Sequence, residues 1–144
     1  MHSAFGIGCH AAVELGKLPH FLGRKIRENA TQISLGSTQQ IGIVADIFAA
    51  VGNGPKIVDP AMADHGKLYT GFDGAFVEAM KTLCCKADYV LPNMTEACLL
   101  TGTEFKTEYD RVYVDLLLEK LTDLGCKNVI FTGISYQEGK TGIV

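Results

Sequence analysis

The sequence predicts an α/β protein with three layers, α/β/α, in which a mainly parallel sheet is covered by helices. Two observations support this prediction. From residue 31 onward, short β-branched and apolar runs alternate with stretches whose apolar residues recur at helical spacing. The chain has 144 residues, 47% of them hydrophobic and 20% charged, which is typical of one globular domain with a buried core. We therefore expect one domain over residues 1–144.

The first predicted elements are a strand, a helix and a second strand. TQISL at residues 31–35 is the first strand, and Ser37 follows it as a helix cap with Gln40 three residues later. The helix is expected to end at Gly52. Its expected buried positions are Ile41, Val44, Ile47, Phe48 and Val51. KIVD at residues 56–59 is the next strand.

A second helix is predicted after the long segment that follows KIVD. Asp73 is its expected N-cap, because a short carboxylate side chain can accept a hydrogen bond from a backbone N–H of the first turn. Its apolar positions at helical spacing are Phe76, Val77, Met80, Leu83 and Cys84. DYVL at residues 88–91 is the strand that follows.

The last predicted elements are two helices and a strand. A short helix begins near Asn93 and stops at Gly102, and a longer helix follows Thr107. The longer helix has its expected apolar positions at Val112, Leu116, Leu117, Leu121 and Leu124. NVIFT at residues 128–132 is the last strand. In residues 1–30, glycines, prolines and charges interrupt any period, so no element is predicted there.

Composition and charge exclude several classes of partner. A formal net charge of −3 leaves no basic excess that would attract nucleic acid or an anionic membrane surface. No apolar run approaches the roughly 20 residues that span a bilayer, and the N-terminus lacks a basic region followed by an apolar stretch. We therefore expect a cytoplasmic protein. The four histidines show no paired metal-binding spacing, and His65 is expected to face solvent.

The cysteines are odd in number and have no CxxC spacing, which argues against a disulfide framework or a zinc site. We expect reduced and mostly buried thiols at Cys9, Cys84, Cys85, Cys98 and Cys126.

Polar or small residues follow four of the predicted strands, at Gly36, Asp59, Asn93 and Thr132. Open α/β sheets bind ligands at the carboxyl ends of their strands. A surface loop explains any one of these residues, but four on one edge favour a ligand site there.

The segment from residue 59 to residue 72 is longer than an ordinary connection between a strand and a helix. Pro60 fixes the backbone after the strand, and Gly66 and Gly71 permit hinge-like dihedral angles. We expect an irregular loop that closes over a substrate as a lid. A surface excursion without function is the alternative.

PNMTEA at residues 92–97 has two interpretations that the spacing leaves open. Asn93 and Glu96 have the spacing of a capping box at a helix start. Equally, Glu96 is a second acid on the same edge as Asp59, able to hold Mg²⁺ through water, because this hard cation prefers oxygen ligands and keeps much of its hydration.

Two glycine-containing stretches do not carry the motifs they first suggest. FTGISYQEGKT is not a Walker A loop, because Ile134 stands where its first glycine is required. Thr132 and Gly133 remain as a place where a hydroxyl and backbone N–H groups could meet phosphate oxygens. GIGCHA at residues 6–11 satisfies GxGxxA, with Glu28 further on, but too few residues precede it to form a first strand, so a dinucleotide site is disfavoured.

Four segments together resemble the pyridoxal kinase branch of the ribokinase-like superfamily. They are LGSTQQIGIVADIF, VDPAMADHGKLY, ADYVLPNMTEACLLTG and VIFTGIS, in this order and separation, so that the resemblance covers about residues 35–144. The resemblance implies a ribokinase-like α/β fold. It also implies ATP-dependent phosphorylation of the 5′-hydroxyl of a vitamin B6 vitamer, which is pyridoxal, pyridoxine or pyridoxamine.

The same resemblance implies roles for the matching residues. Asp59 and Glu96 organise Mg²⁺ and its waters near the phosphates of ATP, and Asn93 belongs to the same Asn-x-x-Glu element. The remaining matches are Asp64 and Tyr69 in a loop over the transferring phosphoryl group, and Thr132 with Gly133 beside the ATP phosphates.

The sequence also departs from the family pattern. Such kinases are roughly twice as long, and their catalytic base is the Asp of a Gly-Thr-Gly-Asp segment that does not occur in these 144 residues. Residues 1–30 have no convincing counterpart of the opening strands of the family. We therefore expect an incomplete ribokinase-like domain with little transfer activity by itself.

Other functions remain open. Hydroxymethylpyrimidine kinases carry similar Asp-Pro and Asn-x-x-Glu elements, although DHGKLY favours pyridoxal. A non-catalytic α/β binding or assembly module, whose exposed strand edges are completed by a partner chain, is the alternative from a different class. A homodimer is also left open.

Overall fold

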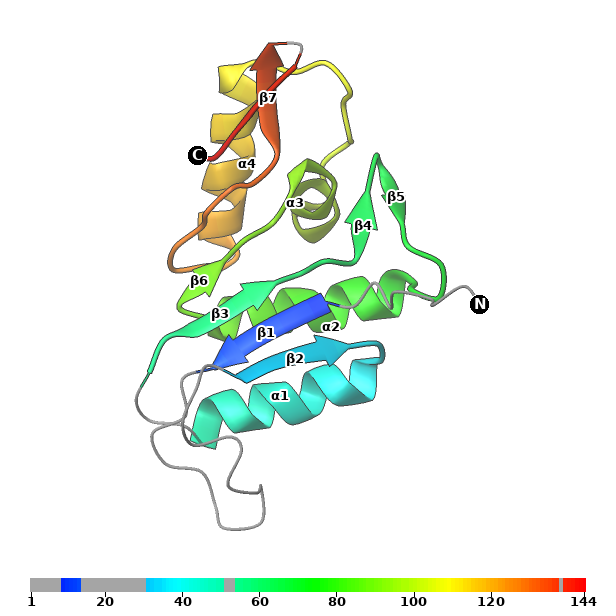
Figure 1. Ribbon diagram of the computed structural model, residues 1–144, viewed down its shortest axis with the longest axis vertical. Coiled ribbons are helices and arrows are strands. Elements are labelled where there is room, and N and C mark those ends of the chain that lie inside the picture. Colours follow the sequence, from blue (N-terminus) through cyan, green and yellow to red (C-terminus); the bar gives the residue numbers. More distant parts are fainter. Residues whose placement is uncertain (1–8, 14–30, 51–53, 138) are drawn as a thin grey trace.

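In the computed structural model, the described residues are 9–13, 31–50, 54–137 and 139–144. Within them, the main sheet has the strand order β2 (Thr31–Leu35), β1 (Cys9–Val13), β3 (Lys56–Asp59) and β6 (Tyr89–Val90) (Figure 1). β3 and β6 pair in parallel, whereas β1 is antiparallel to both of its neighbours. β2, β3 and β6 therefore end at the same edge of the sheet. The predicted α/β class is confirmed.

Residues 128–132 continue the parallel arrangement beyond β6. Val90 and Val129 form a parallel bridge, and the backbone N–H of Thr132 donates to the carbonyl of Pro92 at 2.9 Å. The predicted last strand is therefore found beside β6, but as a single bridge with flanking hydrogen bonds rather than as a regular strand.

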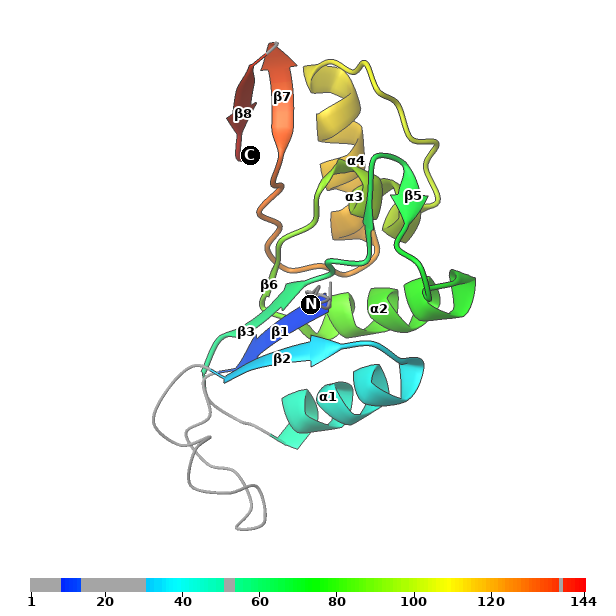
Figure 2. The ribbon, with the colours of Figure 1, turned by 45° about the vertical axis from the view of Figure 1, so that its right-hand side comes forward.

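The helices lie in two groups. α1 (Thr38–Ala50) and α2 (Gly74–Lys86) pack against each other beside the main sheet. α3 (Met94–Thr101) and α4 (Arg111–Asp123) pack against each other in the other half of the molecule, where the hairpin of β7 (Ile134–Gln137) and β8 (Lys140–Gly142) also lies (Figures 1 and 2). None of the helices among the described residues is long and apolar enough to cross a membrane.

Side-chain caps fix where the helices begin. The side chains of Asp73, Asn93 and Asp110 each accept a backbone hydrogen bond from the residue three positions later. The Ser37 hydroxyl accepts the N–H of Gln40 at 3.2 Å, as predicted. α4 begins after Asp110 rather than directly after Thr107, because Asp110 supplies the cap.

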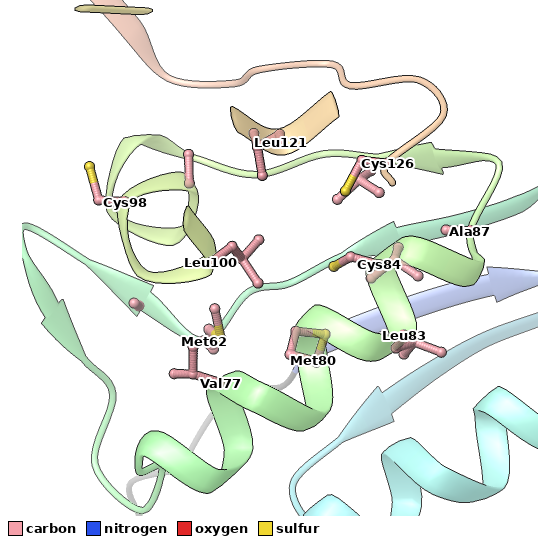
Figure 3. Close-up of a cluster of buried hydrophobic side chains, with 14 of the residues drawn as sticks. Met62, Val77, Met80, Leu83, Cys84, Ala87, Cys98, Leu100, Leu121 and Cys126 are labelled. Carbon is pink, nitrogen blue, oxygen red and sulfur yellow. The ribbon is translucent and has the colours of Figure 1, made fainter. Parts of the chain in front are cut away.

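The helices and the central strands share a core. All five positions predicted for α2 are buried, and Met80, Leu83 and Cys84 belong to the cluster of buried side chains drawn in Figure 3, together with Met62 and Leu100. On α1, three of the predicted residues are buried, Ile47 is half-buried and Val51 lies outside the described residues; the three are Ile41, Val44 and Phe48.

The buried face predicted for α4 is partly wrong. Val112 is 74% exposed and Leu116 is 40% exposed, whereas Tyr113 and Val114 are buried. Leu117 and Leu121 are buried as predicted.

Strands β1, β7 and β8 were not predicted. β1 comes from residues 9–13, where no element was expected, and the hairpin of β7 and β8 follows the last predicted strand. Residues 9–11 of the GxGxxA stretch lie in β1 and not at a helix start, which contradicts a dinucleotide-binding turn. Residues 6–8 and Glu28 lie outside the described residues.

The cysteine prediction holds for four thiols. Cys84, Cys98 and Cys126 are buried thiols, and Cys85 is a half-buried thiol. The side chain of Cys9 lies outside the described residues.

Candidate active site at the strand ends

Three of the predicted site segments come together at one edge of the sheet. Asp59 ends β3, Asn93 follows β6, and Thr132 ends the segment of residues 128–132 beside β6. The Thr132 hydroxyl lies 3.3 Å from the carbonyl of Pro92, next to Asn93. Gly36 follows β2 at the same edge, on the far side of β1.

The start of β1 lies at this edge as well, between Gly36 and Asp59. His10 is opposite Asp59 in the register of β1 and β3, and Cys9 is opposite Leu35. This placement was not predicted, because no strand was expected in residues 1–30.

The segment from residue 59 to residue 72 is not the irregular loop that was predicted. It contains a hairpin of β4 (Ala63–Asp64) and β5 (Lys67–Leu68). The two turn residues, His65 and Gly66, both have positive φ angles, 50° and 76°, as a type I′ turn requires. A glycine at the second turn position is the sequence signal that could have indicated this hairpin. Gly66 therefore lies in a tight turn rather than at a hinge.

The start of α3 holds the base of this hairpin. The Glu96 carboxylate accepts the backbone N–H of Met62 at 3.0 Å, and the Asn93 side-chain amide donates to the carbonyl of Ala63 at 2.9 Å. Glu96 and Asn93 thus link the strand-end region of β3 to the helix that follows β6.

The capping box predicted at residues 93–96 is present. Glu96 accepts the backbone N–H of Asn93 at 2.9 Å, and the Asn93 side chain accepts the backbone N–H of Glu96 at 3.0 Å. The Glu96 side chain is nevertheless almost completely buried, with 1% exposed. This burial raises its pKa to about 7, the hydrogen bond from the Asn93 N–H opposes the rise, and the charge of Asp59 adds to it.

The acids of the two strand ends are therefore close enough to interact. The pKa of the Tyr69 phenol is also raised, first by burial and then by the negative charges of Asp64, Glu96 and Asp59. Asp59 is half-buried and accepts the backbone N–H of Ala61 at 3.2 Å. We refer to Asp59, Asp64, Tyr69 and Glu96 as the acid cluster.

Asp64 lies on the outer side of the acid cluster. Its carboxylate is 3.0 Å from the Nδ1 atom of His65 and accepts the His65 backbone N–H at 2.8 Å. The His65 side chain is 93% exposed, as the sequence analysis expected. The Asp64 side chain is thus half exposed to solvent.

Two carboxylates of the acid cluster fit a hydrated divalent cation. The described residues contain no group of three His, Cys, Asp or Glu side chains that could hold a metal ion. Mg²⁺, however, keeps several waters and needs only one or two carboxylates. The negative charge of Asp59 opposes ionisation of Glu96, and a cation between them would reverse this effect.

Thr132 and Gly133 occupy the predicted position at the end of the neighbouring segment. The N–H and hydroxyl of Thr132 both point to the carbonyl of Pro92. Gly133 is exposed and has a φ angle of 69°, which glycine adopts readily. A cavity of about 310 Å³ is lined by residues from Ile134 onward and does not include the acid cluster. Its lining residues are Ile134, Tyr136, Lys140, Thr141, Gly142, Ile143 and Val144.

Comparison with known proteins identifies the family. Residues 30–143 match the family described as phosphomethylpyrimidine kinase. A pyridoxal kinase of Dictyostelium discoideum is 30% identical over 89 residues, which cover 61% of this chain and 28% of that protein.

Solved structures share the fold. A Bacteroides thetaiotaomicron protein assigned as a phosphomethylpyrimidine kinase, in a crystal form with pyridoxal, is 34% identical with a TM-score of 0.67, over 73% of this chain and 37% of that chain. The pyridoxal kinase of Leishmania donovani in complex with ADP is 25% identical with a TM-score of 0.58, over 66% of this chain and 33% of that chain.

This chain therefore spans between about a quarter and two fifths of the length of these relatives. The ribokinase-like fold that the sequence motifs implied is confirmed by these structures. Since the match extends over residues 30–143, well over half of the sequence, the chain belongs to the phosphomethylpyrimidine kinase family.

Proposed function

We propose that this chain carries the metal-binding and nucleotide-binding side of an ATP-dependent kinase that phosphorylates the 5′-hydroxyl of pyridoxal, pyridoxine or pyridoxamine. The observation that supports this proposal best is the convergence of Asp59, Glu96 and Thr132 at the ends of adjacent strands. The structure of the Bacteroides relative is a crystal form with pyridoxal, and the structure of the Leishmania relative is a complex with ADP. Both ligands are consistent with this reaction.

The acid cluster suits phosphoryl transfer, which requires positioning and charge compensation rather than covalent chemistry by the protein. A bound Mg²⁺ supplies positive charge beside the phosphates. In our proposal, the half-buried Asp59 carboxylate at the edge would bind waters of this ion. Glu96 has both carboxylate oxygens bonded to backbone N–H groups, so it would act on the ion through water.

The remaining predicted residues receive roles around the phosphates. Asp64 and Tyr69, at the two ends of the hairpin of β4 and β5, face the transferring phosphoryl group. Asn93 fixes the orientation of Glu96 through the capping box. Thr132 and the exposed backbone of Gly133 lie beside the phosphate oxygens of the nucleotide.

Calorimetric titration of the chain with ATP, in the presence and absence of Mg²⁺, tests this proposal. We expect binding that requires Mg²⁺ and is lost in Asp59→Ala. Asp46→Ala is the matched control, because Asp46 is an exposed aspartate on α1, and it should bind as the unchanged chain does. Binding that survives Asp59→Ala, or that does not depend on Mg²⁺, would contradict the proposed roles.

A coupled assay with ATP and pyridoxal tests the activity of these 144 residues. We expect little or no turnover, because the Gly-Thr-Gly-Asp segment that supplies the base in the resembling kinases does not occur in them. Ordinary turnover would show that another group of this chain supplies the base.

A hydroxymethylpyrimidine is the second candidate substrate, and the name of the matching family, which specifies a phosphomethylpyrimidine, favours a substrate of the pyrimidine class. Competition between pyridoxal and hydroxymethylpyrimidine for phosphorylation, measured in a full-length relative, separates the two. Size-exclusion chromatography tests the alternative of a non-catalytic assembly module, which a clean monomer would argue against.

A further inference from the structure

The tip of the β4–β5 hairpin is tied to α3 by a contact that the predicted roles do not use. The hairpin ladder pairs Asp64 with Lys67, and the backbone N–H of Gly66 lies in the turn between them. This N–H donates to the Thr95 hydroxyl at 3.0 Å. Thr95 is 2% exposed, so a turn amide that would ordinarily face water is bonded to a buried side chain of another element.

A ring packs against the same turn residue. A Cβ atom placed on Gly66 would lie 2.7 Å from the Cδ1 atom of Phe105, closer than side chains approach each other. Phe105 is partly buried and packs on the core. The turn is therefore held by Thr95 and Phe105, which come from α3 and from the segment after it.

The hairpin is thus fixed at both ends. Glu96 and Asn93 bond its base, at Met62 and Ala63, while Thr95 bonds its tip. All three bonding residues belong to the first turn of α3 or to its cap. The same helix start that carries Glu96 consequently determines where the hairpin lies.

We propose that Thr95 and Phe105 are positioning residues that anchor the tip of the β4–β5 hairpin on α3 and thereby orient Asp64 and Tyr69. The link to Asp64 and Tyr69 rests on the function proposed above, since only there do these residues face a phosphoryl group. The anchoring of the hairpin to α3 rests on the contacts at its base and tip alone.

Amide hydrogen exchange measures the anchoring directly. We compare Thr95→Val, which keeps the shape but removes the hydroxyl, with Thr95→Ser, which keeps the hydroxyl. A hydrogen bond contributes about 0.5–1.5 kcal/mol, so we expect the amide of Gly66 to exchange roughly three- to tenfold faster in Thr95→Val. Thr95→Ser should restore the slow exchange. Thr101→Val is the matched control, because Thr101 donates its hydroxyl to Ala97 within α3 and does not touch the hairpin.

The phenol of Tyr69 gives a second measurement that does not require ATP or activity. If Thr95→Val loosens the hairpin, Tyr69 leaves the acid cluster and its raised pKa falls toward the ordinary value. Absorbance titration near the phenolate band measures this change. The titration curve of the same protein carrying Tyr69→Phe is subtracted from each curve, so that only the Tyr69 phenol remains. A loss of Mg²⁺-dependent ATP binding in Asp59→Ala concerns only the proposed function and leaves this test unaffected.

Two results would overturn the anchoring by Thr95 and Phe105. One is an amide of Gly66 that exchanges in the unchanged chain as fast as an unprotected amide. The other is equal exchange in Thr95→Val, Thr95→Ser and the unchanged chain, with the titration of Tyr69 also unchanged.

Discussion

Replacing Glu96 with glutamine removes a buried negative charge while it keeps the size and shape of the side chain. In the unchanged protein, Glu96 is 1% exposed and bonds the backbone N–H groups of Met62 and Asn93. Glutamine can accept one of these bonds through its oxygen, but its amide group faces the other N–H donor. The absolute change in stability therefore combines a removed charge with an unsatisfied N–H group.

The pH dependence of the free energy of unfolding separates the effect of the Glu96 charge from the effect of the unsatisfied N–H group. The pKa of Glu96 is raised from 4.5 to about 7 by folding, so the folded state holds the proton more tightly than the unfolded chain. The stability contributed by the protonated acid is fully present below about pH 4.5 and is lost as the pH rises through about 7. At about 1.4 kcal/mol for each pKa unit, the loss amounts to roughly 3 kcal/mol.

Urea unfolding at several pH values between 4.5 and 8 measures this loss. We expect the free energy of unfolding of the unchanged protein to fall by roughly 3 kcal/mol more over this range than that of Glu96→Gln. Glu119→Gln, on the exposed face of α4, is the control and should keep the pH dependence of the unchanged protein. Equal pH dependence in Glu96→Gln and the unchanged protein would refute a raised pKa at Glu96, and with it the electrostatic coupling to Asp59.

Three further predictions concern the acid cluster, the hairpin and the core. Saturating Mg²⁺ should lower the raised pKa of the Tyr69 phenol, because a cation offsets the surrounding carboxylates; absorbance titration against Tyr69→Phe measures it, and an unchanged pKa would argue against cation binding there. Gly66→Ala should destabilise the protein by at least about 1 kcal/mol, because the new methyl group meets Phe105 and φ is positive. Chemical denaturation measures this change, and Gly74→Ala, where an added Cβ atom would meet no side chain or other segment within 4 Å, should have a smaller effect. Met80→Ala should destabilise by about 2–5 kcal/mol, since Met80 is fully buried; an effect below about 1 kcal/mol would contradict its place in the core.

Much of the fold could be predicted where local signals agree with tertiary packing. The helix α2 is the best example, because the Asp73 cap and a single apolar face both follow from its sequence, and all five predicted positions are buried. α4 was harder, because apolar residues occur at Val112 through Val114 as well as at Leu116 through Leu118. Such a helix has two candidate faces, and only packing against α3 selects Tyr113 and Val114 over Val112 and Leu116.

β1 could not be predicted for a related reason. Its sequence, CHAAV, has only one β-branched residue and no clear alternation, so its strand conformation depends on pairing with β2 and β3 on both sides. The hairpin of β4 and β5 likewise depends on distant contacts. Two strands of two residues each are too short to be stable by themselves, and the first turn of α3 supplies the bonds that hold them.

The two interpretations of Asn93 and Glu96 are compatible, although the sequence analysis treated them as alternatives. A capping box accepts glutamine as well as glutamate at its fourth position, so capping alone does not require a charge at residue 96. In this protein the position is almost fully buried and lies beside Asp59, where an unpaired carboxylate is unfavourable. An acid at this position is better explained if a positive charge is present at the edge of the sheet during function. The capping box then holds the carboxylate in a fixed orientation, and a hydrated cation shared with Asp59 would offset its charge.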